Sequence, residues 1–429
     1  MHKFISRSIA FSTLLLLAYY ASADVKDFSC EKSRISYTLT GPANLTVQLF
    51  NPSGALVTTM FAGIQQEGKY YFDWNGKGSD GNPILNGDYS LKIGIDRKAV
   101  NDIKFGKDGF VQFGNPVDME VDKNGDIYVL DKGIPLLKDG KNTGKFIKPL
   151  GIYKFRGDGT PVPDFYPSET NFLGLASCRN WLAISDKNIF YAAPGHKINV
   201  HEKTGVLLYS IGGWNPDPKN KNDRTCEGKR GIYGGENGGA IGSDNKIYIR
   251  NRDGNQIKVF NRSLPKGEGW LFTEYKNLPM CGGGGPSLIS DGKNKLYLTS
   301  CGGKPSIGRY DARENEIVFR YKYLKPLGSV MGMALDKDML YVAERAPISQ
   351  VYQLWDNQEA FSLVYIFSDD AIKGLRDVAV SPDGKSLYLL EDGENSGKIL
   401  GKARLFKYDL GYSNVLEQKV KIADGIINK

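Results

Sequence analysis

The chain has 429 residues, of which 24% are charged, 11% are aromatic and 51 are glycine, a composition of folded domains rather than of general disorder. It contains only three histidines and no C-x-x-C-H motif, which excludes a multihaem cytochrome and a histidine-rich metalloenzyme. Many short apolar runs separated by glycine, asparagine and aspartate predict an all-β protein. At ~100–200 residues per domain, the length predicts two or three domains.

Residues 1–23 have the pattern of a cleaved secretory signal. Lys3 and Arg7 provide a positive start, an apolar stretch follows over 12–20, and the small residues of 21–23 provide a cleavage site. The apolar stretch is too short to span a bilayer comfortably, and no later stretch reaches ~18 apolar residues. We therefore expect an exported protein, in the periplasm, an organelle lumen or the extracellular space, with no transmembrane segment in the mature chain.

The basic character of the chain is moderate. The formal net charge is +8, and the leader carries two of these positive charges. The remaining charges are spread along the chain without a block of one sign, and no aromatic-basic stacking motif occurs. We therefore expect no nucleic-acid partner.

Residues 24–97 form a separate pattern of short strands divided by turns. Alternation of apolar and polar residues, typical of half-buried strands, occurs over 35–39, 45–50 and 56–61. A W-N-G turn follows at 74–76, and a D-G-x-x-I-x-x-G-x-Y hairpin at 80–89. These motifs resemble the immunoglobulin-like (Ig-like) domain of the flagellar hook-capping (FlgD-type) family, which implies a β-sandwich that acts as a spacer or docking module. Cys30 is expected in an exposed segment just ahead of the sandwich.

From residue 98 onward, a unit of about fifty residues recurs six times. In each copy an apolar stretch meets an Asp/Asn/Gly turn and then an aromatic-centred strand, which holds Tyr128, Tyr191, Tyr248, Tyr297, Tyr341 and Tyr388 in turn. Third and fourth strands follow, and four strands per unit predict a β-propeller over 98–429. We expect six blades, with a seventh in the irregular region 139–170 as the alternative.

Two copies of the unit, 115–131 and 378–388, resemble NHL repeats, which implies an NHL-like propeller. NHL-class lyases of the peptide-amidating type bind zinc through several histidines. Outside the leader this chain has only His196 and His201, too few for that set, and His201 is expected at a surface strand end. The segment 122–126 superficially resembles a calcium loop, but we interpret it as a turn because no EF-hand glutamate follows.

Propeller topology would gather charged residues on one face. The strands of a blade run antiparallel from the axis outward, so the loop entering the first strand and the loop leaving the second open on the same face, around the central channel. Residues at these positions make a candidate ligand site: Asp118, Asp131, His196, Glu236, Arg250, Glu344, Arg345, Arg376, Asp377, Glu391 and Asp392. The alternative is a salt-bridge network that lines the channel.

The same rule places four of the five cysteines on this face. Cys281–Cys301 and Cys178–Cys226 could form disulfides in an oxidising compartment. Free buried thiols are the alternative, because spacing alone does not decide pairing.

Residues 213–239 form a long insertion rich in glycine, lysine and asparagine. Long loops in compact domains often carry function. Trp214, Lys229 and Tyr233 in this insertion are candidate anchors for a protein partner.

The sequence leaves two functions open. The first is a non-catalytic binding or scaffold subunit of an extracytoplasmic complex, with no cofactor of its own. Its size, leader, propeller and lack of haem motifs resemble the haem-free propeller subunit of hydrazine synthase, which implies c-type haem subunits as partners. The second is a lactonase- or lyase-like propeller enzyme that uses channel-facing carboxylates, such as Glu391 and Asp392, with or without calcium.

Overall fold

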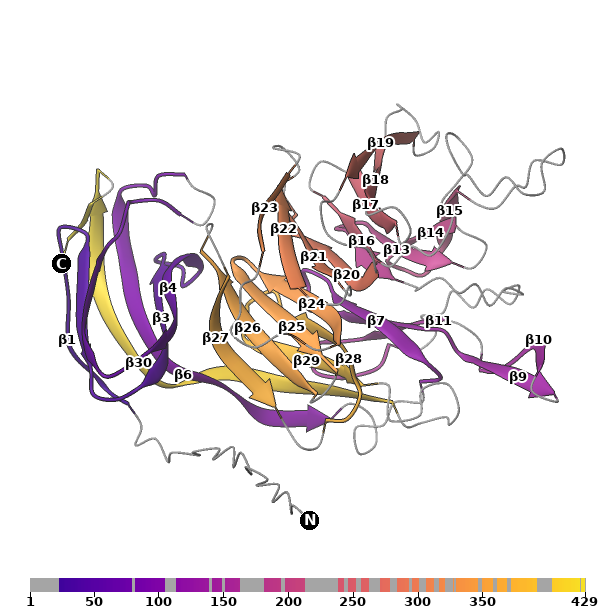
Figure 1. Cartoon of the computed structure of the whole chain (residues 1–429), viewed down its shortest axis with the longest axis horizontal. Coiled ribbons are helices and arrows are strands. Elements are labelled where there is room, and N and C mark those ends of the chain that lie inside the picture. The colour runs from indigo at the N-terminus through magenta and orange to yellow at the C-terminus, as the bar shows by residue number, and fades with distance from the viewer. Residues whose placement is uncertain are drawn as a thin grey trace, which may run out of the picture.

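The computed structural model describes residues 23–78, 82–104, 113–138, 141–148, 151–162, 181–193, 197–212, 238–242, 246–251, 256–261, 271–277, 284–292, 295–300, 306–311, 316–320, 327, 329–345, 349–357, 361–368, 372–391, 403–424 and 426–428. Throughout these ranges the regular elements are β-strands, which form a sandwich and a ring of small sheets (Figure 1). The all-β prediction is confirmed. In this part of the chain no helix has the length and apolarity needed to cross a membrane.

The sandwich has two sheets. One contains β1 (Val25–Glu31), β2 (Arg34–Leu39) and β5 (Gly68–Asp73), and the other contains β3 (Ala43–Phe50), β4 (Leu56–Gln65) and β6 (Gly87–Lys104). Alternate residues of a strand point to the same face, and Ile35, Leu45 and Val47 are therefore buried together in the core. The alternation in the sequence is the core-facing pattern of these strands.

The last strands of the chain complete the sandwich. β30 (Arg404–Ala423) pairs antiparallel with β6 along nearly the whole length of both strands, and β31 (Ile426–Asn428) pairs with the end of β30 (Figure 1). Val420, Ile422 and Ile427 are buried in the sandwich core. The N-terminal domain is thus built from both ends of the described chain.

This arrangement differs from the expected division into 24–97 and 98–429. The position 97/98 falls inside β6, and residues 411–423 pair with the sandwich part of that strand. The physical reason is that β6 and β30 are continuous strands, and each of them runs from the sandwich into blade 6. No turn interrupts either strand where it passes from one domain to the other.

Cys30 lies inside the sandwich rather than in an exposed segment. It is on β1 opposite Ile35 of β2, and it is 2% exposed. The expectation of exposure is wrong because β1 already begins at Val25 and is a strand of the domain. Burial raises the pKa of the Cys30 thiol to about 11, which keeps the thiol protonated and unreactive near neutral pH.

Six blades form the propeller and are numbered in chain order (Figure 1). Five of them are separate small sheets, and the sixth is one end of a seven-stranded sheet that continues into the sandwich. Blade 1 has β7 (Pro116–Val121), β8 (Ile127–Asp131) and β11 (Gly151–Phe155), and blade 2 has β12 (Leu182–Ile184), β13 (Asn188–Ala193), β14 (Lys197–Glu202) and β15 (Leu207–Gly212). Blade 3 has β16 (Gly238–Ile241), β17 (Lys246–Asn251), β18 (Gln256–Asn261) and β19 (Leu271–Asn277), and blade 4 has β20 (Gly284–Ser290), β21 (Lys295–Ser300), β22 (Ser306–Asp311) and β23 (Glu316–Arg320). Blade 5 has β24 (Val330–Asp336), β25 (Met339–Glu344), β26 (Gln350–Asp356) and β27 (Phe361–Ser368). Blade 6 joins β28 (Leu375–Val380) and β29 (Ser386–Glu391) to the first part of β30 and the last part of β6.

The blades close into a ring. The first strands of successive blades contact one another, and β28 of blade 6 contacts β7 of blade 1. Within region 139–170, β10 (Lys141–Lys148) forms a hairpin with β9 (Ile134–Lys138), and β11 is the third strand of blade 1. The described residues therefore form six blades, without room for a seventh between neighbouring first strands.

The repeated aromatic residue packs each blade against the next. Tyr128 of blade 1 is buried with Leu182 of blade 2, and Tyr388 of blade 6 is buried with Val129 of blade 1. In blade 2 the register gives this position to Phe190 rather than to Tyr191. The periodic tyrosines thus mark the hydrophobic contacts that hold the ring together.

Candidate functional site

The predicted channel-face residues lie where first strands begin and second strands end. The structure describes Asp118, Asp131, Arg250, Glu344, Arg345, Arg376, Asp377 and Glu391, whereas His196, Glu236 and Asp392 fall outside the described residues. The hydrogen bonds of the described members show what each one does.

Asp131 closes the loop that leads into blade 1. Its carboxylate accepts hydrogen bonds from the backbone N–H groups of Gly114 and Asn115, each at 2.6 Å, and of Gly133 at 2.9 Å. The residue is fully buried, and these donors replace its lost hydration. Asp131 therefore has a structural role.

Glu344 and Glu391 are also bound by neighbouring side chains. Glu344 accepts hydrogen bonds from the Tyr352 hydroxyl at 2.9 Å and from the side-chain amide of Gln350. Glu391 accepts one from the Arg404 guanidinium at 2.8 Å and one from the backbone N–H of Lys373 at 3.1 Å. Both glutamates are nearly fully buried, so these contacts fix them within blades 5 and 6.

Two arginines of this face make contacts within the ring. The Arg250 side chain donates to the backbone carbonyl of Thr299, which links blade 3 to blade 4. The backbone N–H of Arg345 donates to the carbonyl of Ser329 at 2.8 Å. Like the contacts of the two glutamates, these are separate polar contacts inside the ring.

Asp118 and Asp377 form a carboxyl pair between blades 1 and 6. Asp377 accepts a hydrogen bond from the backbone N–H of Met119 at 2.6 Å, and Asp118 accepts one from Leu182 of blade 2 at 2.5 Å. Burial raises the pKa of both carboxyls, and the neighbouring Asp118 raises that of Asp377 further, while Arg376 opposes the shift at Asp118. A hydrogen bond between the two carboxyls raises the pKa of Asp377 and lowers that of Asp118, so the pair holds one shared proton to a higher pH than ordinary carboxyls do.

We expect Asp118→Asn to flatten the pH dependence of stability. The folded pair keeps a proton that unfolded carboxyls release above about pH 4, so the free energy of unfolding falls as the pH rises from there through the raised folded pKa. An asparagine amide can donate to Asp377 while its oxygen accepts from Leu182, which preserves the contacts without the proton. The effect is about 1.4 kcal/mol for each unit of pKa shift removed.

This prediction is checked by urea unfolding of both proteins between pH 5 and pH 9. Asp158→Asn is the control, since Asp158 is an exposed turn carboxylate whose pKa is lowered by hydrogen bonds to Thr160. Parallel pH profiles for Asp118→Asn and the unmodified protein would contradict the shared proton.

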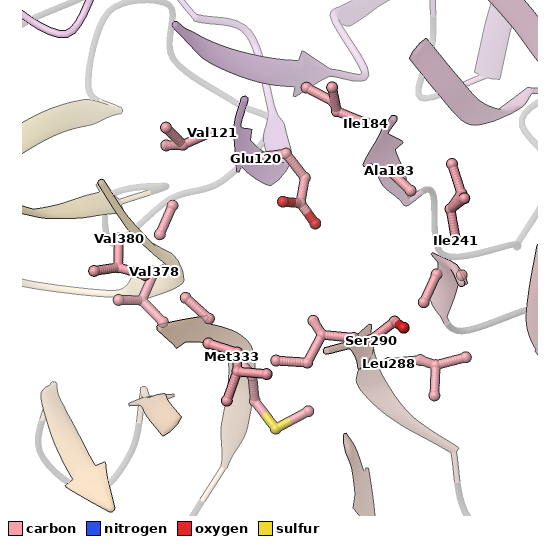
Figure 2. Close-up of a pocket in the computed structure, with 16 residues that line it drawn as sticks. Glu120, Val121, Ala183, Ile184, Ile241, Leu288, Ser290, Met333, Val378 and Val380 are labelled. Atoms are coloured by element: carbon pink, nitrogen blue, oxygen red, sulfur yellow. The ribbon is translucent and has the colours of Figure 1, made fainter. Parts of the chain in front are cut away.

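The central channel contains a cavity of about 160 Å³. It lies along the C-terminal halves of the first strands, farther along each strand than Asp118 and Asp377. Its walls are apolar side chains from all six blades, among them Ala183, Ile241, Met333 and Val380 (Figure 2). Polar atoms, from Glu120, Ser290 and the backbone of the first strands, make up most of its exposed surface. Such a cavity at the centre of the ring suits a small ligand.

Glu120 points into this cavity (Figure 2). Burial raises the pKa of its carboxyl to about 8, with a further contribution from the negative charge of Asp118. Although a water-sized molecule inside the channel can reach Glu120, the low-polarity walls still disfavour its charged form.

Glu120 was not among the site residues predicted from the sequence. A signal was present, because the first strands of the repeats can be aligned on the aromatic residue of the second strand. At the position of Glu120, the other blades have alanine or isoleucine. A charge at a position that is otherwise apolar marks an exception to the repeat, and exceptions of this kind often serve function.

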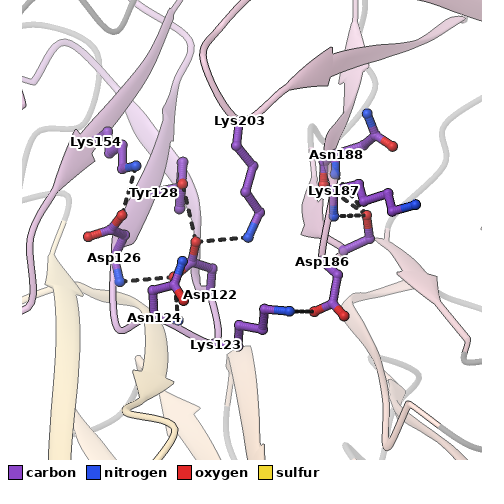
Figure 3. A network of polar contacts seen from close by, with 11 residues as sticks. Asp122, Lys123, Asn124, Asp126, Tyr128, Lys154, Asp186, Lys187, Asn188 and Lys203 are labelled. Atoms are coloured by element: carbon purple, nitrogen blue, oxygen red, sulfur yellow. Dashed lines mark hydrogen bonds and ion pairs between the residues drawn. The ribbon is translucent and has the colours of Figure 1, made fainter.

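The segment 122–126 is a turn, as interpreted from the sequence (Figure 3). The Asp122 carboxylate accepts hydrogen bonds from the backbone N–H groups of Asn124 at 2.9 Å and Asp126 at 3.1 Å, and from Lys203 of blade 2 at 2.8 Å. Burial opposes ionisation of Asp122, but these bonds prevail and lower its pKa. Among the described residues there is no group of three or more His, Cys, Asp or Glu that could hold a metal ion.

His201 is buried rather than at a surface strand end. It is 1% exposed, and its Nδ1 lies 3.0 Å from the carbonyl oxygen of Gly205. The expectation of exposure is wrong because the turn that follows β14, which contains Gly205, lies against the imidazole of His201.

Several predicted residues lie outside the described part of the chain: Cys178, Cys226, Cys281 and Cys301, and the insertion residues Trp214, Lys229 and Tyr233. Their disulfide and partner roles stay predictions.

Comparison with known families settles the nature of the N-terminal domain. The FlgD Ig-like domain family model matches residues 22–98. The sandwich is a FlgD Ig-like domain. No curated protein matches the chain in sequence.

Several solved structures are similar to the chain at low identity. A protein of unknown function from Bacteroides thetaiotaomicron is 12% identical, with a TM-score of 0.48 over 91% of this chain and 99% of that one. Virginiamycin B lyase from Staphylococcus aureus is 15% identical, with a TM-score of 0.46 over 74% and 99%. The WD40 repeats of RRP9 are 12% identical, with a TM-score of 0.45 over 73% and 97%.

A second cavity, of about 580 Å³, lies between the FlgD Ig-like domain and blades 4 and 5. The Ig-like domain contributes apolar side chains such as Leu56, Ile84 and Leu85, and the propeller contributes Asp291, Lys295, Lys337 and Asp338. Burial raises the pKa of Asp338 to about 6 and lowers that of Lys295. Concave surfaces between domains are common binding sites.

Proposed function

We propose that the chain is an exported, non-catalytic binding or scaffold protein and a subunit of a larger extracytoplasmic complex. The observation that carries this proposal is that neighbouring groups of the protein already bind the channel-face carboxylates. Asp131, Glu344 and Glu391 are buried and accept hydrogen bonds from their neighbours. A general base or a calcium ligand needs lone pairs that face the substrate or the ion, and this arrangement favours a structural role for these carboxylates.

The junction between the two domains supports a scaffold role. β6 and β30 pass from the FlgD Ig-like domain into blade 6, and β4 of the Ig-like domain contacts β27 of blade 5. At this second contact the Phe61 ring meets Trp355 with 6.0 Å between centroids, and the Thr59 hydroxyl donates to Asp338 at 3.3 Å. Two separate connections hold the domains in one orientation, as a spacer between partners requires.

An enzyme of the lactonase or lyase type is the second candidate, and Glu120 is the observation that favours it. A carboxyl with a pKa of about 8 is suited to proton transfer near neutral pH. Calcium fits this position less well, because Ca²⁺ takes roughly six to eight oxygen ligands and Glu120 is the one carboxylate among the described residues that line the cavity.

The proposal is tested by gentle purification of the tagged chain from its native source, with size-exclusion chromatography, mass spectrometry and metal analysis of the peak. We expect the chain to elute well above the size of a monomer together with partner subunits. Haem absorbance in that peak would identify the partners as c-type haem proteins. These are the partner subunits implied by the resemblance to the hydrazine synthase subunit.

The partner insertion is tested in the same experiment with a double variant, Trp214→Ala with Tyr233→Ala. The variant should elute as a monomer with an unchanged melting temperature. Leu136→Ala, at an exposed residue of β9, is the matched control and should keep its partners. A monomeric, calcium-loaded protein from the native source would overturn the scaffold proposal and favour the enzyme.

A further inference from the structure

Glu120 is the one charged residue at a position that repeats in all six blades. On β7 it stands opposite Tyr128, and the corresponding residues of blades 2 to 6 stand opposite the equivalent aromatic residue. Those corresponding residues are Ala183, Ala240, Ile289, Ala334 and Ala379. Four alanines leave open space around the axis, and the glutamate projects into that space (Figure 2).

The side chain of Glu120 has no hydrogen-bond or ion-pair partner among the described residues. It contrasts with Asp131, Glu344 and Glu391, which are all bound inside the protein. A largely buried carboxyl without a partner costs free energy of folding. A ligand that donates to this carboxyl would offset that free energy. An unpartnered polar group that faces a cavity is typical of a binding site and not of a packed core.

The charges near the cavity favour a cation. On the strands that line the channel, the titratable groups close to Glu120 are Asp118 on its own strand and Asp377 and Arg376 on β28. The carboxyl pair carries about one negative charge when it shares one proton, and Arg376 offsets it. An ionised Glu120 would therefore be the uncompensated charge at the cavity.

The shape and walls of the cavity define the class of cation. A volume of about 160 Å³ holds on the order of five water molecules or one small organic ion. Alanine, isoleucine and methionine side chains of the walls suit an alkyl group. Glu120 is the one carboxylate among the described residues that line the cavity, whereas a metal ion such as Ca²⁺ is usually held by several acidic oxygens. The one carboxylate suits an ammonium group, which donates hydrogen bonds and carries a positive charge.

We infer that the central channel binds a small primary alkylammonium ion, with its ammonium group on the Glu120 carboxylate and its alkyl group against the alanines of the neighbouring blades. This inference goes beyond the proposed scaffold function and does not depend on it. A partner complex and a channel ligand can each be present or absent without the other.

Binding of such an ion is linked to release of a proton. Near pH 7 the empty channel holds Glu120 mainly in its protonated form, because its pKa is about 8. The ion binds the ionised carboxylate, so only that fraction is competent, and the apparent affinity should rise about tenfold between pH 7 and pH 9. The alkylammonium probe keeps its charge over this range.

The test is isothermal titration of the purified full chain with n-propylammonium chloride at pH 7 and pH 9. We expect one site per chain and the affinity increase stated above. 1-Propanol, which has the same size and no charge, should bind at least tenfold more weakly. Saturable binding that is equal for the two compounds, or no binding of the amine at tens of millimolar, would overturn the inference.

Two variants locate the ion. Glu120→Gln keeps the size of the side chain and should weaken amine binding at least tenfold. Ala183→Ile fills the channel from blade 2 and should also weaken it, and it should fold because Ile289 already occupies the corresponding position in blade 4. Glu417→Gln, at an exposed glutamate, is the control and should bind as the unmodified protein does. Unchanged binding by Glu120→Gln would assign the amine to another site.

Discussion

Deletion of residues 411–429 is expected to unfold the FlgD Ig-like domain. Val420, Ile422 and Ile427 would leave its core, and burial of such side chains contributes about 2 kcal/mol each. The backbone partners of β6 between Gly87 and Lys98 would be lost as well. Together these losses approach the ~5–15 kcal/mol that stabilises a whole domain.

The measurement is differential scanning calorimetry combined with limited proteolysis. The deletion variant should lose the thermal transition of the Ig-like domain, and protease should cut within residues 24–97. Val420→Ser with Ile422→Ser should reproduce most of the effect. Val415→Ser is the matched control on the same strand, because Val415 is 50% exposed, and it should melt as the unmodified protein does. A deletion variant with an intact Ig-like transition would show that β30 is dispensable for the sandwich.

Gly332→Ala is expected to destabilise the propeller by about 3 kcal/mol or more. A Cβ atom at Gly332 of blade 5 would overlap Oδ1 of Asp377 and lie 2.9 Å from its Cα. The carboxyl cannot move aside without cost, because it accepts hydrogen bonds from the backbone N–H groups of Val378 at 2.8 Å and Met119 at 2.6 Å. The substitution would therefore separate blades 5 and 6.

Denaturant unfolding compares this variant with Gly41→Ala. At Gly41 the nearest atom to an added Cβ is Cβ of Ala23 at 3.8 Å, which is ordinary contact, so the change in stability should stay within about 0.5 kcal/mol. Equal unfolding midpoints for the two variants would contradict the close packing of Gly332 on Asp377. A propeller that fails to fold only with Gly332→Ala supports it.

The repeat, the all-β class and the Ig-like motifs could be predicted from the sequence because each depends on local pattern. The alternation of Ile35 and its neighbours, and the recurring tyrosines such as Tyr128, follow from burial on one face of a strand. The role of residues 411–423 could not be predicted in this way. Their pattern is that of any half-buried strand, and their partner β6 is chosen by packing between distant segments.

The candidate site was predicted only in part. Topology indicates that residues at the ends of second strands gather on one face, and Asp131 and Glu344 lie at such strand ends. Topology does not indicate whether such a carboxylate accepts hydrogen bonds from the protein, because its donors lie on loops and on neighbouring strands. Tyr352 of β26, which donates to Glu344, is an example. The alternation within β7 does not distinguish Glu120, which stands out only when its position is aligned across the six blades.

The strand pair β6–β30 has a consequence for how the chain matures. About 300 residues separate the two strands along the sequence, so the entropy cost of bringing them together is large and their pairing is slow compared with local hairpins. During synthesis from the N-terminus, neither the Ig-like domain nor blade 6 can be completed until the last strand arrives. A chain that stops early leaves β6 as an unpaired edge, which is a template for aggregation. Both domains therefore depend on β30, and a chain that lacks this strand can complete neither of them.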